Sequence, residues 1–315
     1  MKKWLKWLAA VVAAISLTAC GGGDDDAPPG NIVQVAQANN QTALTAAVNK
    51  AGLAAPLSDS GASLTVFAPT DAAFGTLATQ LGFANATAMV NALPASALAN
   101  ILTYHVLPTK KTAADLIAGS STQPTLYSFG GSPASLKLST SGGVSITDAA
   151  LTVAHVTTAD VPASNGVVHV IDKVLIPPGV LNIVQMAQVN PIFTTLVNAV
   201  VTANLQGTLS GAGPFTVFAP TNDAFAAIQS TVAGLTTAQL TKVLTYHVLG
   251  SQVLAANIPF GSPITTVEGE TLTINAGNPP TITDRTATPA PIVATDVRAS
   301  NGVIHVVSKV LIPTL

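Results

Sequence analysis

The stretch TVFAPTDAAF at residues 65–74 returns as TVFAPTNDAF at residues 216–225. Three more stretches recur in the same order: NIVQVAQAN at 31–39, LTYHVL at 102–107 and SNGVVHVIDKVLIPP at 164–178 have counterparts at 182–190, 244–249 and 300–314. The second copy is shorter only between these stretches, and deletions of that kind belong in surface loops. Each copy is far longer than the roughly 20–50 residues of a solenoid repeat, so each is expected to bury its own core and fold as a domain.

Residues 1–19 have the features of an export signal. Three lysines, at positions 2, 3 and 6, precede an apolar run at 8–17 that is too short to span a bilayer. The run ends in LTAC at 17–20, which resembles the lipobox of bacterial lipoproteins, where the cysteine is lipidated and the signal is cut before it. Cys20 is the only cysteine of the chain, and attachment of more than one acyl chain holds a protein firmly on a membrane. We therefore predict lipidation at Cys20.

The residues after the lipobox predict a leash and a location. Residues 20–30 combine the cysteine with GGGDDDAPPG, a stretch too polar and too rich in Gly and Pro to pack, so it is expected to be a flexible leash. Gly21 rather than Asp follows the cysteine, and its resemblance to the sorting pattern of enteric-type lipoproteins implies the outer membrane. The predicted location is the bacterial cell envelope, with the protein lipid-anchored and either periplasmic or surface-exposed.

Composition excludes several classes of function. Charged residues make up 8% of the chain, against about 25% in a typical soluble domain. Of the 12 Lys and Arg residues, three lie in the signal, so nine basic residues face 14 acidic ones and the mature chain carries a net charge near −5. Without a basic stripe, nucleic acid is not an expected partner. A single cysteine excludes a disulfide framework and a thiolate metal site.

Within each copy, the hydrophobic pattern changes from a helical period to a period of two. In the first copy, apolar residues recur at helical spacing at Ile32, Val35, Ala36, Leu44 and Val48, and a short β-rich run follows at 64–67. A further helical stretch covers 95–103 in the first copy and 237–245 in the second. Thr70 and Thr221 are expected as N-caps of the helices that carry Phe74 and Phe225. Later, the segments at 136–138 and 144–146 flank SGG as a hairpin. Helices followed by antiparallel strands predict an α+β fold, a β-sandwich with helices along one side.

These residues carry a resemblance to a known family. Each copy is similar to the signature boxes of fasciclin (FAS1) domains: it contains TVFAPT followed by Asp or Asn, then a Tyr-His segment, then SNGV with HV and KVLIP. The two matching copies together cover nearly all of residues 31–315. The resemblance implies wedge-shaped FAS1 domains at 31–178 and 182–315, of the kind found in secreted and membrane-anchored adhesion and matrix proteins. The connector at 178–181 is short and contains proline, so we expect it to hold the two domains in a nearly fixed relation.

The Tyr-His pairs are candidate site residues: Tyr104 with His105, and Tyr246 with His247. A catalytic histidine needs a nucleophile or a carboxylate within reach, yet the sequence has no G-x-S-x-G, H-E-x-x-H or Walker motif. The nearest carboxylate pair, Glu268 and Glu270, lies in an apparent hairpin turn. We expect both histidines to be structural and hydrogen-bonded, and the same for His155, His169 and His305 on the strand patterns. No cofactor, metal or catalytic activity is predicted.

A second pair of candidates precedes the last shared stretch. In animal members of the family an Asp-Ile dipeptide at this place has been implicated in integrin binding, as has the Tyr-His segment. The resemblance therefore makes Asp160-Val161 and Asp296-Val297 candidate interaction residues. The alternative is that each aspartate caps the turn leading into Ser-Asn-Gly.

Two functional hypotheses follow. The first is a non-catalytic adhesion or matrix-interaction protein, tethered to the envelope, whose partner is a protein or polysaccharide of a matrix, an envelope or another cell. The second is a periplasmic small-ligand or carbohydrate binder, or an envelope enzyme, although aromatic residues make up only 4% and sugar-stacking surfaces are scarce. A ligand site predicts a concave pocket with converging polar groups in each copy, whereas an adhesion module predicts a broad, shallow patch.

Overall fold

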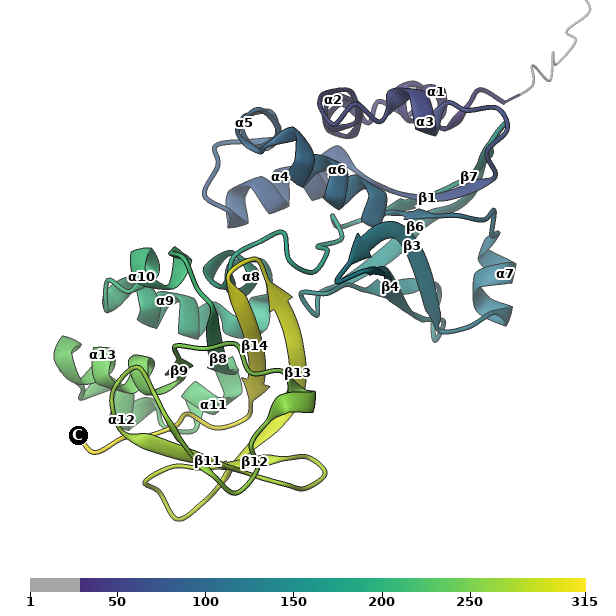
Figure 1. Ribbon diagram of the computed structural model, residues 1–315. Coiled ribbons are helices and arrows are strands. Elements are labelled where there is room, and N and C mark those ends of the chain that lie inside the picture. Colours follow the sequence, from purple (N-terminus) through teal and green to yellow (C-terminus); the bar gives the residue numbers. More distant parts are fainter. Residues whose placement is uncertain (1–28) are drawn as a thin grey trace, which may run out of the picture.

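The computed structural model describes residues 29–315, which form two α+β domains that follow one another along the chain (Figure 1). The export signal, Cys20 and most of the predicted leash lie outside the described residues. Within residues 29–315, no single helix is both long enough and apolar enough to cross a bilayer. The bent pair Ala86–Ala92 and Ala95–Tyr104 meets that test only jointly, by length and composition.

The first domain starts with helices and ends with strands, as predicted. Its helices are α1 (Ile32–Ala38), α2 (Thr42–Lys50), α3 (Ala54–Leu57), α4 (Asp71–Gln80), α5 (Ala86–Ala92), α6 (Ala95–Tyr104) and α7 (Ala113–Ala118). Its strands are β1 (Leu64–Pro69), β2 (Val106–Leu107), β3 (Thr122–Phe129), β4 (Ser132–Ser139), β5 (Ser145–Thr147), β6 (Val153–Ala163) and β7 (Gly166–Ile171).

The second domain repeats this order. Its helical segments are α8 (Ile183–Val189), η1 (Pro191–Phe193), α9 (Thr194–Thr202), α10 (Gln206–Ser210), α11 (Asn222–Ala226), α12 (Gln229–Ala233), α13 (Thr237–Tyr246) and η2 (Ala255–Asn257). Its strands are β8 (Phe215–Pro220), β9 (Val248–Leu249), β10 (Pro263–Thr265), β11 (Thr271–Asn275), β12 (Thr281–Thr283), β13 (Ala290–Ala299) and β14 (Gly302–Val307). Several of these elements, such as α11, β10 and β11, are shorter than their counterparts.

Each domain has a seven-stranded sheet with the same topology. The strand orders are β2-β1-β7-β6-β5-β4-β3 and β10-β11-β12-β13-β14-β8-β9. The strand of the first shared stretch pairs in parallel with the strand of the last, Leu64 opposite Gly166 and Phe215 opposite Gly302, while the other neighbours are antiparallel. The first and last recurring strands of each repeat therefore lie side by side, as the second and third strands of the sheet counted from the β2 or β9 edge.

The long strand β6 divides the first sheet into two halves, which is how a single sheet becomes sandwich-like. Its first residues, 153–155, pair with β5, whereas residues 156–163 pair with β7, and the bulges lie within the β7 pairing. The halves enclose a core that includes Phe67, Tyr104, Leu136 and Ile146. A second apolar layer packs the helices against β1 and β7. The α+β sandwich with helices along one side is confirmed.

The local signals predicted from the sequence are found at the helix starts and turns. Thr70 and Thr221 accept hydrogen bonds from Ala73 N (3.1 Å) and Ala224 N (3.3 Å) as N-caps. The predicted hairpin is β4–β5. In the β6–β7 turn, glycine is required at Gly166 because a Cβ there would lie 2.2 Å from the carbonyl oxygen of Leu64. Strand β1 runs on to Pro69 and does not stop at Ala68, since Ala68 and Pro69 still lie opposite β7.

The two domains contact each other directly around the connector. The N–H of Gly179 donates to the carbonyl oxygen of Arg298 (2.9 Å), and the side-chain amide of Asn190 donates to the carbonyl oxygen of Ala150 (2.8 Å). The Arg298 guanidinium lies over the Phe129 ring at 5.3 Å. Gly179 has a φ of 76°, and a Cβ at this position would lie 2.2 Å from the Phe129 ring. The junction is thus formed by both domains and leaves no room for a side chain at position 179 of the connector.

Candidate functional site

The paired histidines His105 and His247 are buried at the ends of α6 and α13. In each, Nδ1 lies beside a carbonyl oxygen one helical turn back, Ile101 O at 2.7 Å or Val243 O at 2.8 Å. The N–H of Leu175 or Leu311 donates to Nε2, at 2.8 Å in both cases. Since Nε2 is the acceptor, the proton is on Nδ1, and no ring nitrogen is left for a metal or a substrate.

Burial keeps these histidines neutral. Desolvation lowers the pKa of both His105 and His247 to about 4, although the hydrogen bonds to Ile101 and Val243 act in the opposite direction. Each ring connects the end of its helix to the backbone that follows the last strand. Their geometry is that of structural residues, as expected from the sequence.

The tyrosines next to them are equally inaccessible. Tyr104 and Tyr246 are at most 1% exposed, and their hydroxyls donate to Ser135 O (3.2 Å) and Thr271 O (3.0 Å). Burial raises the pKa of Tyr104 above its ordinary value, and that of Tyr246 to about 12. A partner docking on the outer surface cannot reach either Tyr-His pair, so these four candidates do not form a contact surface.

The candidate aspartates occupy bulges in the long strands β6 and β13. Asp160 and Asp296 both have left-handed backbone, with φ of 59° and 60°. Their carboxylates accept from Ala113 N (2.8 Å) and Ala255 N (2.9 Å), at the starts of α7 and η2. The alternative that they cap the turn into Ser-Asn-Gly is therefore wrong: each caps the segment opposite its bulge. The Asp160 side chain remains 47% exposed.

His169 and His305 support these bulges from below. Their rings stack on Phe67 and Phe218, with centroids 5.7 Å apart in both domains. Nδ1 accepts from the N–H of Asp160 (3.2 Å) or Asp296 (3.4 Å). Nε2 lies 2.9 Å from Lys111 O and 2.8 Å from Val253 O. The histidines fix both the bulge and the facing loop, and burial lowers the pKa of His305.

Bulge and loop together form an exposed face in each domain. On the first domain, residues 157–160 of β6 and residues 108–110 of the loop after β2 are exposed. On the second, Val293 and Thr295 of β13 and residues 250–252 are exposed. We call these the bulge faces. Val161 is partly buried and Val297 is buried, so the aspartates and their exposed neighbours, rather than the valines, present this surface.

Sequence reasoning missed the roles of Asn165 and Asn301 of the Ser-Asn-Gly turns. The Asn165 side chain accepts from Ile32 N (3.0 Å) and donates to Leu57 O (2.9 Å) and Asp59 O (3.0 Å). Asn301 repeats this with Ile183 N, Leu209 O and Gly211 O, each at 2.9 Å. Both asparagines connect the last hairpin to the first helices. One signal in the sequence could have indicated their roles: asparagine precedes the turn glycine in both copies, although the turn itself seemed to require only the glycine.

The enclosed cavities of the two domains are apolar and small. Each has a volume of about 30 Å³ and lies between the first helices and the sheet, with His105 or His247 in its wall. Ligand pockets of drug-sized molecules are roughly 300–1,000 Å³. Since both cavities are little larger than one water molecule and lack converging polar groups, they do not have the properties predicted for a ligand site in each copy.

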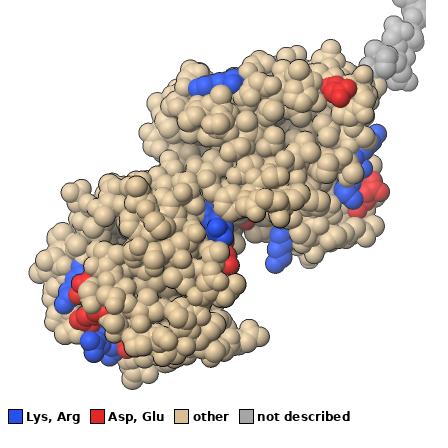
Figure 2. Space-filling model, in the orientation of Figure 1, with Lys and Arg blue, Asp and Glu red and all other residues tan. Residues whose placement is uncertain are grey.

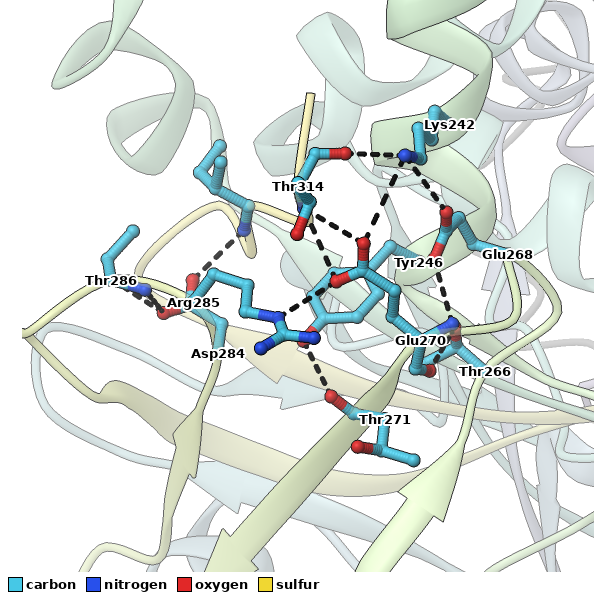
Figure 3. Close-up of polar contacts among 11 residues, drawn as sticks. Lys242, Tyr246, Thr266, Glu268, Glu270, Thr271, Asp284, Arg285, Thr286 and Thr314 are labelled. Atoms are coloured by element: carbon cyan, nitrogen blue, oxygen red, sulfur yellow. Dashed lines mark hydrogen bonds and ion pairs between the residues drawn. The ribbon is translucent and has the colours of Figure 1, made fainter.

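In Figure 2, charged side chains gather at one end of the second domain and at the outer edge of the first domain, and they are sparse over the surface between. Figure 3 shows the cluster: Arg285 Nε donates to Glu270 (2.9 Å), and Lys242 Nζ lies 3.5 Å from Glu268. Glu270 also accepts from Thr314 N (3.2 Å). The hydrogen bond from Arg285 is the main cause that lowers the pKa of Glu270. As predicted, Glu268 and Glu270 lie in a hairpin loop, between β10 and β11, and there they hold the last strand's continuation in place.

Within residues 29–315, no group of three His, Cys, Asp or Glu side chains is placed to hold a metal ion. Among residues 29–315, the recurring histidines and tyrosines are held by fixed hydrogen bonds, and the exposed bulge faces are mostly uncharged apart from Lys110 and Asp160. This arrangement defines a tandem pair of one α+β module whose recurring polar residues serve the fold.

The fasciclin domain family matches residues 39–177 and 191–313, so the chain belongs to this family and contains two FAS1 domains. Protein sll1483 of Synechocystis sp. is 42% identical over 140 residues, which are 43% of this chain and 75% of that protein. Transforming growth factor-beta-induced protein ig-h3 of Sus scrofa is 38% identical over 160 residues, 49% of this chain and 22% of that protein. Among solved structures, the FAS1 domain pair of the insect cell adhesion molecule fasciclin I covers 90% of this chain and 95% of its own, with 15% identity and a TM-score of 0.43.

Proposed function

We propose that this protein is a non-catalytic adhesion protein of the bacterial cell envelope. The observation that supports it is the duplicated bulge face: both domains present the same aspartate, bulge and exposed facing loop, with Asp160 exposed and Asp296 half-buried, and the recurring histidines and tyrosines beneath them are buried and hydrogen-bonded. Broad, shallow surfaces of this kind suit contact with a macromolecule. The family contains a protein described as a cell adhesion molecule, which agrees with this role.

The partner is a protein or a polysaccharide of a matrix, of the envelope or of another cell. Two equivalent faces on one chain allow two simultaneous contacts with a repetitive partner, which raises the overall affinity without any new type of contact. The first bulge face carries the charged side chains of Lys110 and Asp160, whereas the second has only the half-buried Asp296, so we expect any salt dependence of binding to come mainly from the first face. Anchoring through lipid on Cys20 then places both faces at the envelope surface.

A matched set of surface variants tests the adhesive role. Ala159→Arg and Thr295→Arg add a bulky charge to the two bulge faces, and Thr87→Arg adds the same charge to the exposed part of α5 as a control. Cells or vesicles carrying the full chain are bound to immobilised matrix and envelope extracts. We expect at least a tenfold loss of retention with both bulge variants together and none with the control. Equal retention of all variants would show that the bulge faces are not adhesive.

The tether has its own test. In Cys20→Ser no residue can accept the thioether-linked lipid, so we expect an unprocessed precursor or a soluble product. Fractionation after a salt wash, with mass measurement of the amino terminus, reads out the result. Continued membrane association with cleavage at the same place would mean that the lipobox prediction is wrong, independently of the adhesive role.

A further inference from the structure

Two equivalent lysines near the ends of the domains have different surroundings. In the second domain, Lys309 Nζ donates to the buried Asp284 carboxylate at 2.9 Å and also to the Thr286 hydroxyl. The corresponding residues of the first domain are Lys173 and Asp148, at the same places in the repeat. Among residues 29–315, no carboxylate lies within ion-pair distance of Lys173.

The Asp148 carboxylate is satisfied by its own loop and by the segment after β7. It accepts from Ala150 N (3.0 Å), Thr152 N (2.8 Å), the Thr152 hydroxyl (2.9 Å) and Ile176 N (2.9 Å). The Thr152 hydroxyl thus takes the place that the lysine amine has in the second domain. Lys173 is left to face elsewhere.

Lys173 lies in the wall of a cleft between the two domains. Thr76, Gln80 and Leu77 of α4 form one side, Thr152 and Val174 lie beside the lysine, and Val189 and Pro191 of the second domain close the cleft. Its volume is about 80 Å³, and Lys173 is partly buried there. A cleft at a domain interface is a common place for a small-molecule site, but this one is far below the volume of a drug-sized pocket and has room only for the carboxylate end of a small acid.

The free hydrogen-bond donors and acceptors of the cleft determine which kind of ligand it can bind. The Thr152 hydroxyl gives its proton to Asp148, and the Thr76 hydroxyl gives its proton to Ala72 O (3.0 Å), so both oxygens are left as acceptors. The Gln80 amide makes only a long bond to Val189 O (3.5 Å). Lys173 provides a positive charge and three donors. The cleft therefore offers a cation beside hydroxyl oxygens that can accept, with aliphatic walls.

We propose that this interdomain cleft binds the carboxylate of a small hydroxy acid. The carboxylate pairs with Lys173, an adjacent hydroxyl of the ligand donates to Thr76 or Thr152, and the carbon chain lies against Leu77, Val189 and Pro191. The same chemistry is present in a free acid such as lactate and in the sugar acid that ends an acidic glycan. Because residues of both domains line the cleft, occupancy stabilises the junction as well.

Ligand-observed saturation-transfer NMR on the full chain in detergent tests the site. The probes are lactate, propionate, which lacks the hydroxyl, 1,2-propanediol, which lacks the carboxylate, and glucuronate as the sugar acid, all at one ionic strength. We expect lactate to bind, propionate to bind several-fold more weakly and propanediol not to bind. Binding of glucuronate more tightly than lactate assigns the site to a glycan end, and the reverse order assigns it to a free acid.

Variants separate this site from nonspecific anion binding. Lys173→Met should weaken lactate binding at least tenfold, whereas Lys137→Met, an exposed lysine of the same domain, should leave it unchanged. Thr76→Val keeps the cation and should reduce the preference for lactate over propionate. Three results would overturn the proposal. The first is equal lactate binding by the wild type and Lys173→Met, and the second is lactate binding to Lys137→Met and Lys173→Met that chloride displaces equally. The third is binding of propanediol. The outcome does not depend on whether the bulge faces are adhesive.

Discussion

The two domains bury the same aspartate in different ways. Asp284 of the second domain is paired with Lys309, and its pKa lies below the ordinary value, with the Thr286 and Lys309 hydrogen bonds favouring the charged form. Asp148 of the first domain has hydrogen bonds but no cation, and burial raises its pKa to about 6. Identical folds therefore give one carboxylate that is charged at any moderate pH and one that titrates close to neutrality.

The difference shows that the buried aspartate of a repeat can keep the same hydrogen bond to the backbone while its electrostatic surroundings change. In both domains the aspartate accepts the N–H of the segment after the last strand, Ile176 or Ile312, each at 2.9 Å. What changes is the second donor to the oxygen that accepts this N–H: the Thr152 hydroxyl in the first domain and Lys309 in the second, where the Thr286 hydroxyl donates to the other carboxylate oxygen. Because the Thr152 hydroxyl replaces the lysine as donor to Asp148, Lys173 lies in the wall of the interdomain cleft instead. This one difference in partners therefore affects both the pH response of the first domain and the interdomain cleft.

Removal of the lysine partner should have the largest effect. Lys309→Met leaves the Asp284 side chain, which is 0% exposed, without its cation, and we expect the second domain to lose about 3 kcal/mol of unfolding free energy. Lys173→Met is the matched control and should cost the first domain less than about 1 kcal/mol. Calorimetry, with hydrogen exchange to assign each loss to its domain, checks this. Equal losses in the two variants would contradict the comparison.

Acidification should distinguish the domains nearly as strongly. His105 and His247 have a folded pKa near 4 against an ordinary 6.5, so both domains lose stability from this source as pH falls through that interval. Asp148, with a folded pKa near 6 against 3.8, has the opposite sign, because the folded state binds the proton first. Each shift corresponds to about 3 kcal/mol at 1.36 kcal/mol per pKa unit. Between pH 7 and 4 the first domain should change little, whereas the second should lose about 3 kcal/mol from His247 and more from His305, whose pKa burial also lowers.

The stability of each domain can be followed separately by hydrogen exchange. The exchange is measured peptide by peptide over this pH range and corrected for intrinsic rates. Asp148→Asn removes the titrating carboxylate, and we expect the first domain of this variant to lose about 3 kcal/mol on acidification through His105. Parallel loss of stability in both domains of the unmodified chain would show that Asp148 is ionised throughout this range.

The histidine pair serves as an internal standard, because its geometry is the same in both domains. His105→Ala or His247→Ala leaves the N–H of Leu175 or Leu311 without an acceptor and opens a small cavity, so each should cost its own domain about 1–3 kcal/mol. We expect the melting temperature of that domain to fall by several degrees, with any loss of binding only a consequence. Calorimetry is paired with a binding assay well below the transition. Unchanged melting with lost binding would give the histidines a functional role.

The smallest effect concerns the connector. Gly179→Ala places a Cβ against the Phe129 ring at a positive φ, and we expect about 1 kcal/mol of lost stability together with a looser junction. Small-angle scattering of the mature chain should fit one interdomain arrangement for the native sequence and a broader distribution for the variant. A broad distribution for the native sequence would mean that the short connector does not fix the domains.

The sequence predicted the fold because the signals involved are local. Threonine caps, the helical period at 95–103 and the hairpin around SGG depend on neighbours within a few residues, and all three are confirmed. Helices α5 and α7 were not predicted. The role of Asp160 could not be derived, since its partner Ala113 is brought near only by the bulge register. The contrast between Lys173 and Lys309 depends on the path of the loops around Asp148 and Asp284, which the repeated motifs do not encode.

The parallel pairing of β1 with β7, and of β8 with β14, also fixes when each domain can form. During synthesis the first strand of each repeat emerges long before the partner that completes the sheet, and the Asn165 and Asn301 side chains that secure the first helices arrive equally late. Distant pairings of this kind slow folding, and domains fold in the order in which they are made. Each FAS1 domain therefore reaches its native state only when its final strand is delivered, and the connector emerges just after the first domain closes.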